Sequence, residues 1–251
     1  MSTRTVRGTV RGMADRANPA FAAAVVVVSL SALGYALTVA TLQRHTYVHV
    51  MAGVLWTGID VFMGAVLGPV VGGLDDEESA AVFRRLTPKT AFLLPAMAVV
   101  TIGTGLPLAI ERGFLDPAAP WLALFTAANL VPALFLIGYR LRAFRDWRWQ
   151  LPFAVATLGS LAWVATTVGD IGGIDHVMLG ALAIVTVLSV QGFGYLMPGE
   201  LRMYAEMTSA DPDESVIAAI GRQNAMLGGV QGALQLVLIA LMVSLRYGGT
   251  F

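Results

Sequence analysis

Two of the three histidines in this chain open matching hydrophobic segments. One segment begins His-Val-Met-Ala-Gly at His49, and the other begins His-Val-Met-Leu-Gly at His176. Imidazole nitrogens bind haem iron, copper and zinc. Because the two histidines stand at the same place in two similar stretches, they are a candidate pair of ligands for one metal or haem. A histidine at the start of a membrane helix also serves as an interfacial residue, and this alternative stays open.

Three further residues after His49 could take part in chemistry. Trp56 can stack on a macrocycle and Gly58 allows the close approach of a flat ring, although either residue alone also fits ordinary packing. Asp60 lies within a long apolar stretch, where a carboxylate costs about 2.5–3.5 kcal/mol on insertion scales. We therefore expect Asp60 to face the protein interior and to act as a proton relay. The alternatives are a cation-binding residue or a buried acid hydrogen-bonded to Asn129, Gln191, Gln231 or Gln235.

His45 provides a second way to build a metal site. It precedes His49 by one helical turn, so both imidazoles could share a face. His45, His49 and His176 together would suit copper or zinc. The thioethers of Met51 and Met178 could assist with Cu(I). We keep this three-histidine site as the alternative to a haem held by two histidines.

The composition indicates an integral membrane protein. The chain has 251 residues, of which 57% are hydrophobic and 13% charged, whereas soluble domains carry about 25% charged residues. The formal net charge is zero, so no basic surface suggests nucleic acid as a partner. The absence of cysteine excludes disulfides, iron–sulfur clusters and Cys-ligated zinc. There is also no Walker loop, and the last apolar segment has no lysine for a retinal Schiff base.

Seven segments are long and apolar enough to cross a bilayer. They are about 19–42, 48–72, 90–110, 119–139, 151–169, 176–197 and 224–245. Most of the sixteen basic residues fall on one side if the N-terminus is inside, and only Arg44, Arg112 and Arg246 fall outside. The positive-inside rule therefore predicts an all-α, multi-pass protein of the cell membrane with N-terminus in and C-terminus out. The inner basic residues are Arg4, Arg7, Arg11, Arg16, Arg84, Arg85, Lys89, Arg140, Arg142, Arg145, Arg148, Arg202 and Arg222.

The matching histidine segments belong to a predicted parallel internal repeat in one transmembrane domain, 1–251. Spans one to three (19–110) correspond to spans five to seven (151–246), and span four (119–139) connects them. Each copy has a proline near the inner end of its second span, Pro69 or Pro198, and an acidic inner loop after it. Short interfacial helices are expected at 80–86 and 216–220, and Glu200 is expected among the interfacial charges. This topology places His49 and His176 at one depth, near the outer surface.

Residues 45–110 resemble a loose group of membrane proteins that includes the copper-resistance CopD family, HemJ-type protoporphyrinogen oxidases and the membrane domain of bacterial urate oxidases. Their pattern is a helix that begins with His, a Trp-x-Gly about seven residues later, a charged loop and a proline-containing helix. It is matched by His49, Trp56-Thr57-Gly58, Arg84-Arg85 and Pro88 or Pro95. The resemblance implies b-type haem at His49 and a functional role for Lys89. The chain has more predicted spans than HemJ types, and its weaker echo at 176–245 lacks the Trp-x-Gly.

The leading hypothesis is a haem-b membrane redox protein, possessing oxidoreductase or electron-transfer activity. His49 and His176 would be axial ligands, Trp56 and Gly58 would line the cofactor, and Asp60 would relay protons. Its partners would be a quinone, an outer-side electron acceptor or a membrane-soluble substrate such as a porphyrinogen, within the lipid bilayer. One alternative is a copper-binding or copper-transporting protein that uses His45, His49 and His176. The other is a non-catalytic membrane subunit or a small-solute transporter that uses Asp60.

Overall fold

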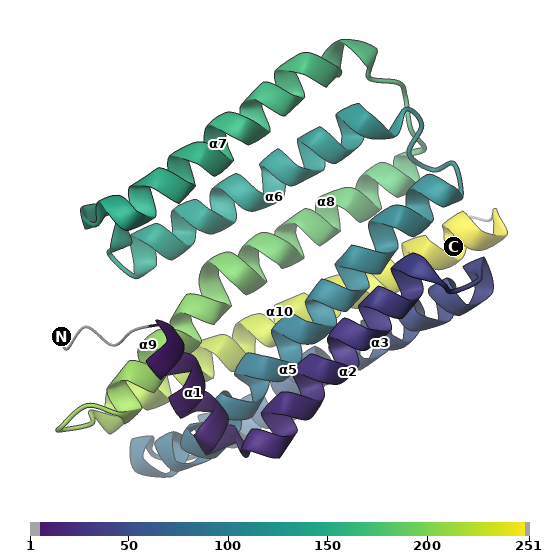
Figure 1. Cartoon of the computed structure of the whole chain (residues 1–251). Helices are drawn as coiled ribbons and strands as arrows, with labels where there is room; N and C mark the ends of the chain where they lie inside the picture. The colour runs from purple at the N-terminus through teal and green to yellow at the C-terminus, as the bar shows by residue number, and fades with distance from the viewer. Residues whose placement is uncertain (1–5, 249–251) are drawn as a thin grey trace. The chain divides into compact units, whose positions relative to one another are not determined.

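The computed structural model describes residues 6–248, and all its regular secondary structure in that range is helical (Figure 1). Arg4, one of the predicted inner basic residues, lies outside the described range. Seven helical segments are long and apolar enough to cross a membrane, which confirms the expected class of a multi-pass membrane protein. They are Pro19–Thr38, Leu42–Gly72, Asp76–Glu111, Ala118–Arg140, Trp147–Asp170, His176–Met207 and Glu214–Tyr247.

The described range contains ten α-helices, two π-helical turns and two 3₁₀ turns, of which α1 and η2 lie outside the seven segments. Their bounds are α1 (Val6–Ala17), α2 (Pro19–Thr38), α3 (Leu42–Phe62), η1 (Met63–Leu67), α4 (Gly68–Gly72), α5 (Asp76–Glu111), α6 (Ala118–Arg140), η2 (Ala143–Arg145), α7 (Trp147–Thr167), η3 (Val168–Asp170), α8 (His176–Gln191), η4 (Gly192–Leu196), α9 (Met197–Met207) and α10 (Glu214–Tyr247).

Two of the spans begin earlier than the sequence predicted, at Asp76 and Glu214. The predicted interfacial helices at 80–86 and 216–220 are not separate elements but belong to the first turns of α5 and α10. Asp75 Oδ1 accepts the backbone N–H of Glu78 at 2.8 Å, and acidic residues fill the first turn of α5, both of which stabilise a helix start. Pro88 and Pro95 lie within α5, where membrane helices tolerate proline. The charged loop segments therefore extend the spans.

The second span begins at Leu42, earlier than expected. Thr41 caps α3, because its Oγ1 accepts the backbone N–H of Arg44 at 3.4 Å. His45 therefore lies on the helix rather than in the preceding loop, one turn before His49.

Two π-helical turns interrupt the second and sixth spans just before a proline. In η1 the backbone N–H of Gly68 reaches back to the carbonyl of Met63, and in η4 that of Met197 reaches Gly192. The next residue in each case is a proline, Pro69 or Pro198. Proline lacks an N–H, and its ring clashes with a carbonyl of the preceding turn. A wider π-helical turn before the proline relieves this steric clash.

Contacts divide the chain into two compact units. Unit 1 comprises Met1–Thr104 and Gly199–Val230, and unit 2 comprises Gly105–Pro198 and Gln231–Phe251. His49 and Asp60 belong to unit 1, whereas His176 belongs to unit 2.

A hydrophobic cluster joins α4, α5, α9 and α10 within unit 1. Val71, Ala80, Phe83, Met203, Met207 and Ile217 are all buried there and pack together. Gly221 is required at this point, since a Cβ would lie 2.2 Å from the Phe83 ring. Gly64 and Gly229 bring η1 and α10 into backbone contact, with a Cβ on Gly64 falling 2.1 Å from the Gly229 Cα.

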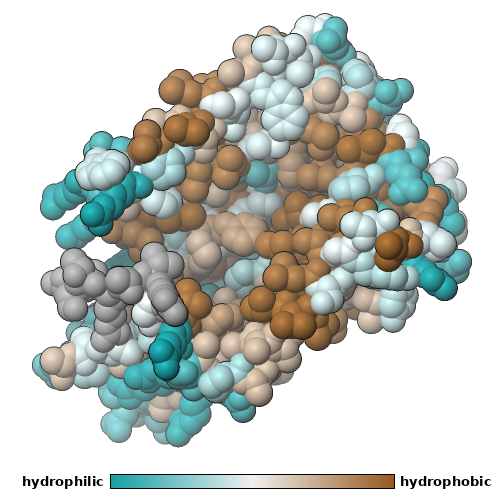
Figure 2. Space-filling view, in the orientation of Figure 1, coloured by the Kyte–Doolittle hydropathy of each residue, from teal (hydrophilic) through white to brown (hydrophobic). Residues whose placement is uncertain are grey.

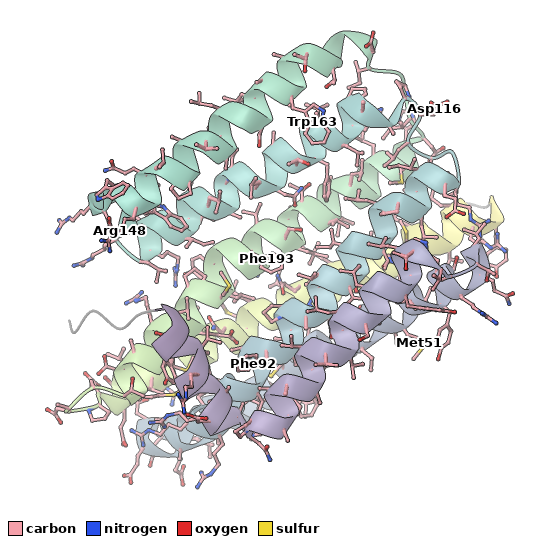
Figure 3. All side chains as sticks on the ribbon, in the orientation of Figure 1. Met51, Phe92, Asp116, Arg148, Trp163 and Phe193 are labelled. Carbon is pink, nitrogen blue, oxygen red and sulfur yellow. The ribbon has the colours of Figure 1, made fainter. Side chains whose placement is uncertain are left out.

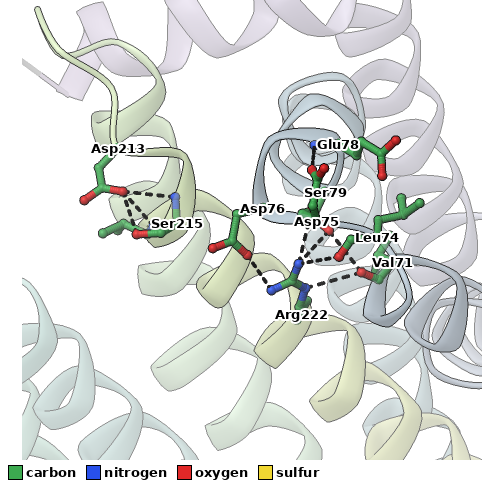
Figure 4. A network of polar contacts seen from close by, with 10 residues as sticks. Val71, Leu74, Asp75, Asp76, Glu78, Ser79, Asp213, Ser215 and Arg222 are labelled. Atoms are coloured by element: carbon green, nitrogen blue, oxygen red, sulfur yellow. Dashed lines mark hydrogen bonds and ion pairs between the residues drawn. The ribbon is translucent and has the colours of Figure 1, made fainter.

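Arg222 ties α10 to the connection between α4 and α5 (Figure 4). Its guanidinium donates to the carbonyl oxygens of Val71, Leu74 and Asp75 at 3.3, 2.9 and 3.2 Å. It also donates to Ser79 Oγ at 3.0 Å and pairs with Asp76 at 2.8 Å. The last carbonyls of a helix lack partners within the helix, so Arg222 satisfies the end of the second span.

The start of α10 is stabilised by Asp213. Its Oδ1 accepts the Ser215 hydroxyl at 2.6 Å and the backbone N–H groups of Ser215 and Val216 at 3.0 and 3.3 Å. These bonds, led by the Ser215 hydroxyl, lower the pKa of the Asp213 carboxyl below its ordinary value.

Unit 2 is built around α6, which packs against α7, α8 and η4. Asn129 Nδ2 donates to Thr186 Oγ1 at 3.2 Å, which links α6 to α8. The Arg140 guanidinium lies 3.7 Å from the centroid of the Tyr195 ring in η4. Gly194 packs on α6, since a Cβ there would lie 3.1 Å from the Ala133 Cα.

The exposed faces of the helices suit a lipid environment. Figure 2 shows hydrophobic residues over much of the visible surface and hydrophilic residues gathered toward helix ends. On α2, for example, Val27, Val28 and Leu30 are 60–65% exposed. Outward-facing apolar side chains of this kind agree with helices that contact lipid chains.

Candidate functional site

One face of α3 gathers most of the residues singled out in the sequence. His45, Trp56 and Asp60 are buried, at 5, 6 and 1% exposure, and His49 is half-buried. His49, Trp56 and Asp60 recur at intervals of about two turns and one turn, so they lie along one stripe of the helix. The stripe faces the interior of unit 1.

The geometry around His49 fixes the tautomer of its imidazole. Nδ1 lies 2.9 Å from the carbonyl oxygen of Thr101 and 3.2 Å from Thr104 Oγ1. A carbonyl can only accept, and the Thr104 hydroxyl donates its own hydrogen to the Val100 carbonyl at 2.6 Å. Nδ1 must therefore carry the proton. In the neutral imidazole, Nε2 then holds the free lone pair that a metal ion requires.

His45 has the opposite arrangement. Its Nε2 lies 3.1 Å from the carbonyl oxygen of Thr104, so Nε2 carries the hydrogen and donates it. Both histidines thus attach α3 to the turn Thr101–Thr104 of α5. In this geometry His45 Nε2 is engaged by the protein and is not open to a metal.

Trp56 and Gly58 lie on different sides of α3. Two residues turn a helix by about 200°, so Gly58 points away from the buried Trp56. Gly58 is exposed, and a Cβ there would meet no atom within 4 Å. Trp56 therefore accompanies His49 on the interior face, while Gly58 offers an open surface on the far side of the helix.

His176 is exposed at the first turn of α8. Asp175 caps this helix, its Oδ1 accepting the backbone N–H of Val177 at 2.7 Å. Of the two methionines suggested as copper ligands, Met178 is buried and Met51 lies on an exposed face of α3 (Figure 3). Within residues 6–248, no group of three or more His, Asp or Glu side chains forms a metal-binding cluster.

Asp60 lies in a confined setting next to the first π-helical turn. Gly228 of α10 lies close by, since a Cβ there would stand 3.9 Å from Asp60 Oδ1. The amides predicted as its hydrogen-bond partners, Asn129, Gln191, Gln231 and Gln235, belong to unit 2. Two of these have partners of their own there: Asn129 donates to Thr186, and Gln231 donates to the Leu188 carbonyl at 3.0 Å.

Glu200 is the residue that sequence reasoning missed. We expected an interfacial charge, but Glu200 is partly buried in α9 and its Oε1 lies 3.1 Å from Thr90 Oγ1 of α5. The sequence offered one signal, the position of Glu200 directly after the Pro198-Gly199 pair that follows the second π-helical turn.

Comparisons of the chain with protein-family models, with curated proteins and with solved structures gave no match.

Proposed function

We propose that unit 1 binds a b-type haem through Nε2 of His49, and that the protein is a membrane redox protein. The observation that carries this proposal is the pair of contacts at His49 Nδ1, to the Thr101 carbonyl and the Thr104 hydroxyl. Metal-ligating histidines almost always donate their other N–H to such an acceptor, which orients the ring and raises the basicity of the ligating nitrogen.

The residues present fit a haem in two further respects. His49 is half-buried within an apolar span, which limits access of water to the ligating nitrogen. Trp56 lies two turns further along the same face. A bound haem would supply one-electron chemistry, suited to passing electrons from a quinol to an outer-side acceptor or to oxidising a membrane-soluble substrate such as a porphyrinogen. The protein would contribute the ligand and its orientation, with Asp60 as proton relay.

The proposal includes the finer topology, with the N-terminus inside, the C-terminus outside and spans one to three repeated as spans five to seven. Support for the repeat comes from the two π-helical turns, each of which precedes a proline after a span that begins near a histidine. His176 as the second axial ligand, and the cell membrane as the location, remain predictions from the sequence.

The absorption spectrum of the purified protein tests the haem. Protein from haem-replete cells should show a Soret band, and His49→Ala should abolish or shift it. Tyr47→Phe, on an exposed position of the same helix, serves as the matched control and should leave the spectrum unchanged. Colourless wild-type protein would contradict the proposal, and stoichiometric copper in metal analysis would favour the three-histidine alternative. His176→Ala tests the second ligand separately.

A proton-coupled small-solute transporter is the second candidate, favoured by the nearly complete burial of the Asp60 carboxyl. Asp60→Asn and His49→Ala distinguish the two functions. A transporter would lose activity in Asp60→Asn and keep it in His49→Ala, whereas a haem protein would lose its spectrum only in His49→Ala. A non-catalytic subunit would tolerate both changes in transport and redox assays.

A further inference from the structure

The connection between α6 and α7, within unit 2, concentrates positive charge. Residues 140–148 include four arginines and one acidic residue, Asp146. The Asp146 carboxylate caps α7, because its Oδ1 accepts the backbone N–H of Arg148 at 2.9 Å. Within residues 6–248, no carboxylate forms an ion pair with any of the four arginines, so their charge is available to a ligand. They are Arg140, Arg142, Arg145 and Arg148.

Aromatic packing holds this connection in place. The Phe144 ring packs against both helices, with its centroid 5.7 Å from that of Phe135 on α6 and 5.2 Å from that of Phe153 on α7. Gln150 Nε2 donates to the Phe144 carbonyl at 2.8 Å. Arginines on a backbone that is already ordered lose less conformational freedom when they bind a ligand.

Arg140 is the most constrained of the four arginines. The carbon of its guanidinium lies 3.7 Å from the centroid of the Tyr195 ring, which is a cation–π contact. Its Nε is buried and has no hydrogen-bond acceptor among the described residues. The ring therefore fixes the plane of the guanidinium, while the protein supplies neither a counter-charge nor an acceptor for Nε. A planar guanidinium of this kind suits the binding of an oxyanion.

Arg142 stands where glycine is the usual residue. It follows Leu141, the last cap of α6, and has a φ of 55°, in the left-handed region. Glycine takes the positive φ after α5 and after α10, at Gly113 and Gly248, because a side chain is strained there. The Arg142 side chain is exposed and forms no hydrogen bond with a described residue. Contacts within the protein therefore do not explain an arginine at this position.

One face of α7 continues from the arginines into apolar side chains. Arg148 is exposed in the first turn of α7, and Figure 3 shows it at this end of the helix. Leu151, Val155 and Leu158 follow at helical spacing and are 57–67% exposed. Trp147, 66% exposed, is of a residue type enriched at the membrane–water interface. A lipid headgroup at Arg148 would thus continue into acyl chains along α7.

From this arrangement we infer that the α6–α7 connection binds the phosphate group of an acidic phospholipid. The arginines provide N–H donors and charge for the phosphate oxygens. A lipid fits better than a soluble phosphate, because the exposed apolar face of α7 begins beside Arg148 and can pack against an acyl chain. The site depends neither on a haem nor on the direction in which the chain crosses the membrane.

Native mass spectrometry of the full chain in a neutral detergent tests the site. Each arginine near a membrane surface strengthens the attraction to acidic lipid by about fivefold. The wild type should therefore bind phosphatidylglycerol at least about fivefold more tightly than phosphatidylcholine with the same acyl chains, whose choline cation offsets the phosphate charge. Arg142→Gln should weaken phosphatidylglycerol binding by about fivefold. Arg112→Gln, at an exposed arginine between α5 and α6, is the matched control and should leave it unchanged.

Arg142→Gly separates the need of the ligand from that of the fold. Glycine relieves the left-handed conformation, so this variant should unfold at no lower temperature than the wild type while it loses about fivefold in phosphatidylglycerol binding. Equal affinities of the wild type for the two lipids would overturn the inference. Equal losses in Arg142→Gln and Arg112→Gln would also overturn it, since they would indicate attraction to positive charge in general. Displacement of the lipid by inorganic phosphate at equal concentration would assign the cluster to a soluble anion instead.

Discussion

Thr104 serves both histidines of α3 with different atoms. Its carbonyl oxygen accepts from His45 Nε2, and its hydroxyl oxygen accepts from His49 Nδ1 while donating to the Val100 carbonyl. One buried residue on α5 thus sets the tautomers of two imidazoles. The hydroxyl is the part of this arrangement that a substitution can remove without moving the backbone.

Thr104→Val tests the link between the hydroxyl and the proposed haem site. Valine keeps the shape but removes one of the two acceptors of His49 Nδ1, and loss of such a contact typically weakens metal binding by about 10–100-fold. Because Thr101 still accepts from Nδ1, we expect the lower end, about tenfold, in an absorbance titration with haem. Thr104→Ser restores the hydroxyl and should bind as the wild type. Equal affinities for Thr104→Val and the wild type would contradict the role given to Thr104.

At the level of the helices, two interactions between α10 and the start of α5 differ in their surroundings. Arg222 makes several bonds to backbone carbonyls, and its side chain is 33% exposed. Arg84 forms a single ion pair with Glu214 at 2.9 Å, with side-chain exposures of 32% and 37%. Hydrogen bonds from charged groups to otherwise unpaired acceptors stabilise more than a solvated ion pair.

Arg222→Ala should lower the free energy of unfolding by about 2 kcal/mol, because it removes the donor to the Leu74 carbonyl and one of the donors to the Val71 and Asp75 carbonyls. Arg84→Ala is the matched control and should change it by less than about 1 kcal/mol. Reversible unfolding in detergent, followed by circular dichroism, measures both. Arg222→Lys should fall between them, since one ammonium cannot reach all the carbonyls. Equal effects of Arg222→Ala and Arg84→Ala would mean that the carbonyl contacts stabilise little.

The contact of η1 with α10 requires glycine. Gly64→Ala places a Cβ 2.1 Å from the Gly229 Cα, so the helices must separate, and overpacking of this kind costs about 1–3 kcal/mol. Gly58→Ala, on the same span with no atom within 4 Å of the new Cβ, should stabilise slightly through helix propensity. Opposite signs for the two variants in the same unfolding assay are the expected result. Destabilisation by Gly58→Ala would show that its open face is occupied in the membrane.

At the scale of the whole molecule, the seven spans leave much apolar surface facing outward, and the ends of the spans carry the charges. The asymmetry of the arginines predicts which ends face the cytoplasm. The chain contains no cysteine, so single introduced thiols report topology without background.

Ser209→Cys and Arg112→Cys, both at exposed positions between spans, test the orientation. A membrane-impermeant maleimide added to intact cells should label Arg112→Cys, and it should label Ser209→Cys only after the membrane is permeabilised. The reverse pattern would invert the topology. It would also move the predicted depth of His49 and His176 to the inner surface, and so exclude an outer-side electron acceptor.

The sequence predicts the spans well because a run of about 20 apolar residues is a local property. It also places Asp60 inside, since an isolated carboxylate is costly in a bilayer. The partners of His49 could not be predicted, because the Thr101 carbonyl is a backbone atom 52 residues away. Glu200 could not be recognised either, because its contact with Thr90 depends on how α9 packs against α5, and an acidic residue near a helix end fits an interfacial position equally well.

The two π-helical turns bear on the history of the gene. A turn that closes five residues back holds one residue more than an α-helical turn, and a single inserted codon is the simplest way to create it. Deleting one residue from Met63–Leu67 would rotate the rest of the span by about 100° about the helix axis. Pro69 and the end of the span would then point to a different side. Selection should therefore keep the insertion long after side chains have drifted. A one-residue gap at 63–67 or 192–196 is the mark to look for when distant sequences are aligned with this one.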